Sequence, residues 1–177
     1  MLEPRQISRQ SVPTALKQAQ HYRLLNEPAL AESICRDIIA VVPENEDAWV
    51  TLLWSLTDQF VSRHSTAYDQ AVEILQHFTG EYKRYYYSGI ISERWARAQL
   101  STGLPIESTE NWIRKAMNLF MQANELAAAD DPNPILRWNS CVRLLNLYNL
   151  QAASTGVATQ SFQRDMEGEY GDDVPLL

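Results

Sequence analysis

The chain has 177 residues, of which 45% are hydrophobic and 10% aromatic, so it can bury a substantial core and is not disordered through most of its length. Its net charge of −7, with no run of lysine or arginine, argues against nucleic acid and anionic membranes as partners, because both are bound by clustered basic residues. Residues 165–177 carry −5 of this charge, which leaves a nearly neutral body and an acidic tail.

Residues 1–12 lack helical periodicity and are predicted to form a flexible lead. Apolar residues at three- and four-residue spacing then predict about seven helices in a domain at residues 13–150. The expected helices cover residues 13–25, 28–41, 47–59, 67–78, 81–101, from just after 108 to about 129, and 135–150. Prolines and single glycines mark most of the breaks, and residues 60–66 are expected to form an extended turn.

The composition of residues 151–177 is first polar and then acidic. Phe162, Met166 and Tyr170 recur at four-residue intervals, which hints at one or two further helical turns. A solvated, disordered tail is the favoured interpretation. A linear motif held by a groove is the alternative, because an acidic run ends here in apolar residues and, in the sequence as given, a free carboxylate.

No signal peptide and no transmembrane helix is predicted, because the N-terminal sequence is polar and no stretch approaches ~18 consecutive apolar residues. Cys35 and Cys141 lie within apolar helical patterns and have no CxxC partner. Buried thiols in a reducing compartment are favoured over a disulfide or a ligand role. We therefore expect a cytoplasmic protein.

A proline followed six residues later by a tryptophan occurs twice, at Pro43 and Trp49 and again at Pro132 and Trp138. With the paired helices, this spacing resembles the tetratricopeptide repeat (TPR) family, whose pattern is W-x2-L-G-x2-Y in the first helix and A-x3-F, A and P in the second. The matching residues are Ala15, Ala19, Tyr22, Ala31, Pro43, Trp49, Leu52, Leu56, Tyr85, Gly89, Ala116, Phe120, Ala127, Pro132, Trp138, Cys141 and Leu145.

The resemblance implies an all-α fold in which antiparallel helical hairpins stack as a short, right-handed TPR-like solenoid. An ordinary helical bundle is the alternative. The sequence departs from the family pattern at Leu53, where the family prefers glycine, and Gln18 and Cys35 depart from the apolar pattern of the family.

No catalytic, cofactor-binding or metal-ligating set is predicted. His21, His64 and His77 lie in separate segments without a second ligand at metal-binding spacing. Nucleophile motifs such as GxSxG and glycine-rich phosphate loops do not occur. Asp130 and Asp131 precede a proline and are typical of a turn. We therefore expect a non-catalytic protein-protein interaction module, an adaptor or scaffold that needs neither cofactor nor metal.

In the TPR family, the first helices of successive pairs line a concave groove. Carried over to this chain, that arrangement predicts a groove with arginines, amides and no acid, which suits an acidic or carboxylate-ended peptide. The predicted peptide-binding residues are Gln20, Arg23, Trp54, Tyr86, Arg94, Asn139, Arg143 and Asn146, and the same helical phase adds Val50 and Ile90.

Three other interpretations stay open. In the first, Trp54 and Tyr86 are core residues, and the arginines are simply solvated. In the second, the chain is a structural subunit that forms a homodimer or larger oligomer through its aromatic fifth helix. In the third, the acidic residues 165–177 occupy the chain's own groove or that of a neighbouring copy, since a short tether gives effective concentrations of about a millimolar.

Overall fold

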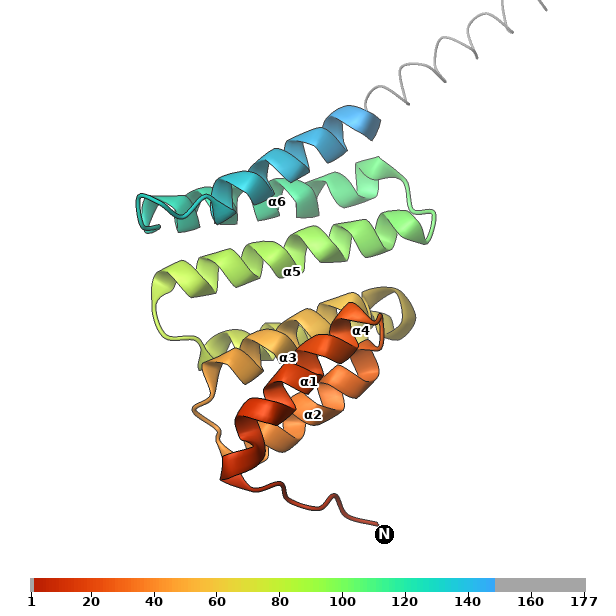
Figure 1. Cartoon of the computed structure of the whole chain (residues 1–177). Helices are drawn as coiled ribbons and strands as arrows, with labels where there is room; N and C mark the ends of the chain where they lie inside the picture. The colour runs from red at the N-terminus through yellow and green to blue at the C-terminus, as the bar shows by residue number, and fades with distance from the viewer. Residues whose placement is uncertain (1, 149–177) are drawn as a thin grey trace, which may run out of the picture. The chain divides into compact units, whose positions relative to one another are not determined.

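The computed structural model describes residues 2–148, except for the side chains of His64 and Ser65. Within these residues the regular structure is entirely helical, without a β-strand (Figure 1). The predicted all-α class is therefore confirmed. The predictions about residues 149–177, including the helical turns near Phe162 and the tail's alternatives, lie outside the described residues.

The helices follow one another with short connections. Their bounds are Val12–Leu24 (α1), Pro28–Val41 (α2), Glu46–Asp58 (α3), Phe60–Ile74 (α4), Glu81–Ser101 (α5) and Ile106–Glu125 (α6), with 3-10 turns at Arg9–Ser11 (η1) and Leu75–His77 (η2). A further helix covers residues 133–148. Pro13 lies in the first turn of α1 and Pro28 in that of α2, where a missing N–H costs nothing.

Two other helix ends follow from local chemistry. The side chain of Asn45 accepts a hydrogen bond of 2.9 Å from the backbone N–H of Ala48, which caps the start of α3. Gly103 follows the end of α5 with a φ of +89°, a left-handed conformation that stops a helix and that glycine adopts without strain.

The prediction of an extended turn at residues 60–66 is wrong, because α4 begins at Phe60, two residues after α3 ends. Phe60 is 1% exposed and packs its ring 5.5 Å from that of Trp95 and 6.0 Å from that of Tyr68. The residues that follow are polar apart from the exposed Val61, so this helical segment gives no apolar periodicity. It is held instead by the core contacts of one phenylalanine and by ion pairing at Arg63.

Consecutive helices pack against each other from α1 to α6, and the odd-numbered neighbours α1 with α3 and α3 with α5 also touch. The α5 and α6 helices lie side by side along most of their lengths (Figure 1). Gly89 on α5 allows this approach, because a Cβ at that position would lie 2.6 Å from a ring carbon of the buried Phe120. The chain divides into two units, residues 1–141 and 142–177.

Cys35 and Cys141 are both free and fully buried, which confirms the predicted burial of the thiols. Burial is also the main reason that the pKa of each thiol rises to about 12. Neither sulfur is therefore a thiolate at neutral pH. Among the helices described, none combines the length and the apolar character needed to cross a bilayer.

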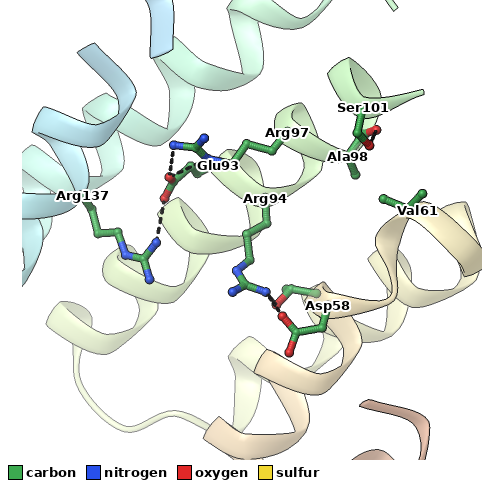
Figure 2. A pocket seen from close by; sticks show the side chains of 9 residues that line it. Asp58, Val61, Glu93, Arg94, Arg97, Ala98, Ser101 and Arg137 are labelled. Atoms are coloured by element: carbon green, nitrogen blue, oxygen red, sulfur yellow. Dashed lines mark hydrogen bonds and ion pairs between the residues drawn. The ribbon is translucent and has the colours of Figure 1, made fainter. Parts of the chain in front are cut away.

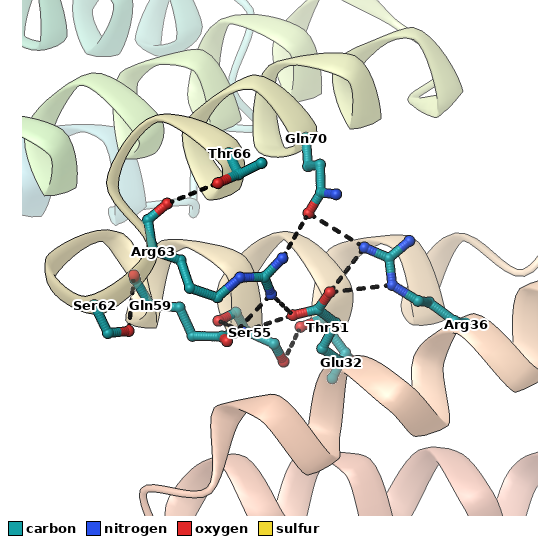
Figure 3. A network of polar contacts seen from close by, with 9 residues as sticks. All are labelled: Glu32, Arg36, Thr51, Ser55, Gln59, Ser62, Arg63, Thr66 and Gln70. Carbon is teal, nitrogen blue, oxygen red and sulfur yellow. Dashed lines mark hydrogen bonds and ion pairs between the residues drawn. The ribbon is translucent and has the colours of Figure 1, made fainter.

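A polar network centred on Glu32 links α2, α3 and α4 (Figure 3). Glu32 is only 7% exposed, and its carboxylate accepts hydrogen bonds from Arg63 at 2.6 Å, from Gln59 at 2.7 Å and from Arg36 at 2.8 Å. Burial acts to raise the pKa of Glu32, but hydrogen bonds from Arg36 and Gln59 and the charges of Arg36 and Arg63 outweigh it, so the pKa is lowered. The folded state therefore favours the ionised carboxylate.

Replacing Glu32 with glutamine should cost about 1–3 kcal/mol of unfolding free energy at pH 7, since hydrogen bonds to a charged group are lost from a buried site. Because the pKa of Glu32 is lower in the folded chain, this stabilisation is present above the unfolded value of about 4.3 and disappears as the pH falls through the folded value. Urea titrations of both proteins at a series of pH values measure the difference. A difference independent of pH would show that the glutamate charge is not its source.

Candidate functional site

Trp54 on α3 is surrounded by guanidinium groups from three other helices. The guanidinium carbons of Arg23 on α1, Arg94 on α5 and Arg137 on the helix at residues 133–148 lie 5.0, 4.6 and 5.3 Å from the centre of the indole ring. Each distance is within the ~6 Å range of a cation–π interaction. The contacts of α3 with α1 and α5 bring the first two of these arginines to the same aromatic ring.

Asp58 holds two of the arginines in place. It lies one turn after Trp54 on α3 and accepts a hydrogen bond of 2.7 Å from Nε of Arg23, together with one from Nη1 of Arg94. The hydroxyl oxygen of Thr57 also accepts a hydrogen bond of 3.1 Å from Arg94. Burial lowers the pKa of Arg94, whereas its hydrogen bond to Asp58 acts in the opposite direction. The arginine still carries its full charge at neutral pH.

Glu93 provides the second carboxylate, and it is 1% exposed. It accepts a hydrogen bond of 3.0 Å from Nε of Arg97, one turn further along α5, and a longer one of 3.4 Å from Nη1 of Arg137 (Figure 2). Nη2 of Arg97 donates to Oγ of Ser140 at 2.9 Å. A buried acid and a serine thus fix the directions in which these two guanidinium groups point.

We call Arg23, Arg94, Arg97 and Arg137, together with Trp54, the arginine cluster. A pocket of about 320 Å³ opens beside it. Its lining consists of Thr57, Asp58, Val61, Glu93, Arg94, Arg97, Ala98, Ser101 and Arg137, several of which Figure 2 shows pointing toward one another.

Four arginines face two carboxylates at this site, so its net charge is +2 although that of the whole chain is −7. Arg94, Arg97 and Arg137 line the pocket together with Asp58 and Glu93, so the pocket wall itself carries +1, beside the small apolar surfaces of Val61 and Ala98. Such a surface is suited to an anionic group attached to an apolar chain.

The structure places the predicted binding residues in different surroundings. Arg23, Trp54 and Arg94 meet in the arginine cluster. Gln20 is exposed one turn before Arg23 on α1, and Asn139 is partly buried near the start of the helix at residues 133–148. These two residues are not in contact with the cluster through any hydrogen bond of the described chain.

Tyr86 lies on α5 but packs against other aromatic rings. Its ring centre is 5.9 Å from that of Tyr82 and 6.0 Å from that of Phe120 on α6. Val50 is partly buried, and Ile90, assigned to the groove by the helical phase, is fully buried. The assignment of Ile90 to the groove surface is therefore wrong, because α5 has neighbours on more than one side.

Arg143 and Asn146 are exposed residues of the second unit, residues 142–177. The described part of that unit, residues 142–148, is helical. They are accordingly not assigned to the arginine cluster.

Sequence reasoning missed Asp58, Glu93, Arg97 and Arg137. Two spacings could have indicated part of this set, because Glu93 precedes Arg97 by four residues and Trp54 precedes Asp58 by four, so each pair shares one face of a helix. Arg137 gives no such signal. Its position depends on contacts of Arg137 and Ser140 with Glu93 and Arg97 on α5.

The described residues include no group of three or more histidine, cysteine, aspartate or glutamate side chains placed to hold a metal ion. Comparison with protein-family models, with curated proteins and with solved structures gives no match to this chain.

Proposed function

We propose that the chain is a non-catalytic, TPR-like interaction module of the cytoplasm that binds an acidic segment of a partner protein at the arginine cluster. The observation that carries the proposal is the convergence of arginines from three helices on Trp54, in a chain whose overall charge is negative. Preorganisation of these side chains lowers the entropic cost of binding, because the guanidinium groups are already gathered around Trp54 before a ligand arrives.

The stacked-hairpin arrangement is part of the same proposal. Support comes from the contacts of α1 with α3 and of α3 with α5, in addition to the contacts between consecutive helices. In a solenoid of helical hairpins the first helices of successive pairs are neighbours and form one surface. Arg23, Trp54 and Arg94 lie on these three helices, and a partner segment would run across them.

The alternative of an oligomer formed through α5 has less support. The exposed residues of this helix are Glu81, Arg84 and Ser101, and none of them is apolar. Tyr82 donates a hydrogen bond to Asp131, and the ring of Tyr87 lies 4.6 Å from that of Phe78. These two tyrosines thus make their contacts within the chain, and the helix offers little apolar surface to a second copy.

Two labelled peptides of the same length test the proposal, one with aspartate and glutamate at alternate positions and the other with lysine and arginine there. Fluorescence anisotropy should show binding of the acidic peptide only, weakening as salt is raised from about 0.05 to 0.5 M, because the contacts are ionic. Equal affinity for both peptides, or binding of the basic one alone, would contradict the proposal.

Replacing Asp58 with asparagine should strengthen binding of the acidic peptide by about 3- to 10-fold, since it raises the net charge of the site from +2 to +3 near the ligand. The same change should lower the unfolding free energy by about 1–2 kcal/mol, because Arg23 and Arg94 lose a charged partner. Anisotropy and urea denaturation measure the two effects. Weaker binding by a stable variant would mean that Asp58 itself contacts the ligand.

A further inference from the structure

The arginine cluster keeps hydrogen-bond donors that its own residues do not use. Each guanidinium has five N–H groups. Within the described chain, Arg94 and Arg137 each donate hydrogen bonds through Nη1 only. No buried side-chain nitrogen or oxygen of the described residues lacks a partner, so the guanidinium nitrogens of these arginines that make no hydrogen bond are not buried. They are available to a ligand in the pocket.

We propose that the group bound by these arginines is a phosphorylated side chain, a phosphoserine or phosphothreonine, on the partner segment. This inference rests on the proposed function, because it concerns the same site and the same class of partner. It specifies the chemistry that distinguishes the correct segment from other acidic segments.

Charge balance favours a phosphate over a carboxylate. Asp58 and Glu93 already neutralise half of the positive charge of the four arginines, which leaves a surplus of +2 over the whole cluster, including Arg23 outside the pocket wall. A single carboxylate leaves part of that surplus, whereas a phosphorylated side chain carries about −1.5 to −2 at neutral pH.

Geometry favours the same conclusion. A carboxylate has two oxygens, and Asp58 and Glu93 each use their own to contact two arginines. An added carboxylate must compete with these fixed internal acids. A phosphate has three terminal oxygens that can accept hydrogen bonds from Arg94, Arg97 and Arg137 at once, and all three line the pocket.

A nucleic acid also carries phosphates, but it fits the surface less well. Its affinity comes from many phosphate contacts along a basic surface, whereas the pocket is a single site in an acidic chain without a lysine or arginine run. One phosphate on a protein segment matches one pocket. The apolar surfaces of Val61 and Ala98 give a neighbouring peptide side chain a place to pack.

The test uses one peptide of fixed acidic sequence prepared with serine, glutamate or phosphoserine at its centre, and anisotropy titrations against the full chain. The phosphoserine peptide should bind at least about tenfold more tightly than the glutamate peptide. Arg137→Ala should remove most of this preference, and Arg84→Ala should preserve it. Arg84 is an exposed residue of the same helix as Arg94, ten residues before it and so about 15 Å away along the axis.

The outcomes separate the two proposals. Equal affinity for the glutamate and phosphoserine peptides would overturn the phosphate inference while leaving the proposed function intact. If none of the three peptides binds, both fall. A labelled single-stranded DNA that binds as tightly as the phosphoserine peptide would also overturn the inference, because the site would then select polyanions in general.

Arg97→Lys gives a second test in case Arg137→Ala does not fold. This variant keeps the charge but loses the planar fork of the guanidinium group, so it should reduce the preference for phosphoserine.

Discussion

Reversal of charge at Arg94 and Arg137 together is expected to weaken binding of the acidic peptide by at least about 100-fold. Hydrogen bonds between charged groups contribute about 1.5–3 kcal/mol each, and the two substitutions both remove such bonds and place two negative charges next to the ligand. Both residues line the pocket, and both have their guanidinium groups over Trp54. Anisotropy titration at low salt measures the loss.

Arg84→Glu is the matched control for this experiment. Arg84 is exposed and lies on α5 with Arg94, but it does not line the pocket. Replacing it with glutamate changes the net charge of the chain by the same amount per substitution. It should change the affinity by less than about twofold at moderate salt, because screening limits the reach of a surface charge. Equal losses in the control and in the double variant would indicate a long-range effect of net charge in place of a binding site. A circular dichroism spectrum like that of the wild type establishes that each variant is folded.

Replacement of Phe120 with alanine is expected to lower the unfolding free energy by about 3–5 kcal/mol. Phe120 is fully buried on α6, and its ring covers Gly89 and approaches Tyr86. The substitution therefore opens a cavity in the contact between α5 and α6, which pack together along most of their lengths. Urea denaturation followed by far-UV circular dichroism measures the change. A loss below about 1 kcal/mol would show that this contact is not part of the core.

Gly89→Ala gives a sharper test of the same contact, because its effect should change sign with residue 120. An added Cβ would lie 2.6 and 2.8 Å from two ring carbons of Phe120, so in the wild type we expect a loss of about 1–2 kcal/mol from overpacking. In the Phe120→Ala background the clash is gone, and the better helix propensity of alanine should stabilise the chain by about 0.5–1 kcal/mol. Additive effects of the two substitutions would contradict direct contact between the residues.

Most helix positions could be predicted from the sequence, because apolar spacing, prolines and glycines act locally. The bounds of α2 and α5 agree with the prediction at both ends, and those of α1 and α3 differ by one residue. The start of α4 could not be predicted, since residues 61–66 are polar or exposed and the helix is held there by Phe60 and Arg63. The end of α6 was placed too late, because the alanines after Glu125 favour a helix locally.

Part of the candidate site could also be predicted. Arg23, Trp54 and Arg94 were assigned to one surface by helical phase, and they do meet. Their carboxylate partners were missed, because a count of residues on one face gives no indication that Asp58 bridges two helices. Arg137 was missed for a similar reason: the phase pointed to Asn139 and Arg143, and only the tertiary contacts of Arg137 with Glu93 and Trp54 place it in the cluster.

The most direct test of the proposed site is an NMR titration that follows the arginine Nε–Hε resonances of the full chain as the acidic peptide is added. The resonances of Arg23, Arg94, Arg97 and Arg137 should shift together with one binding constant, and those of Arg84 and Arg114 should not move. Shifts confined to other arginines, or no shift at about 1 mM peptide, would contradict the conclusion that the arginine cluster is the binding site.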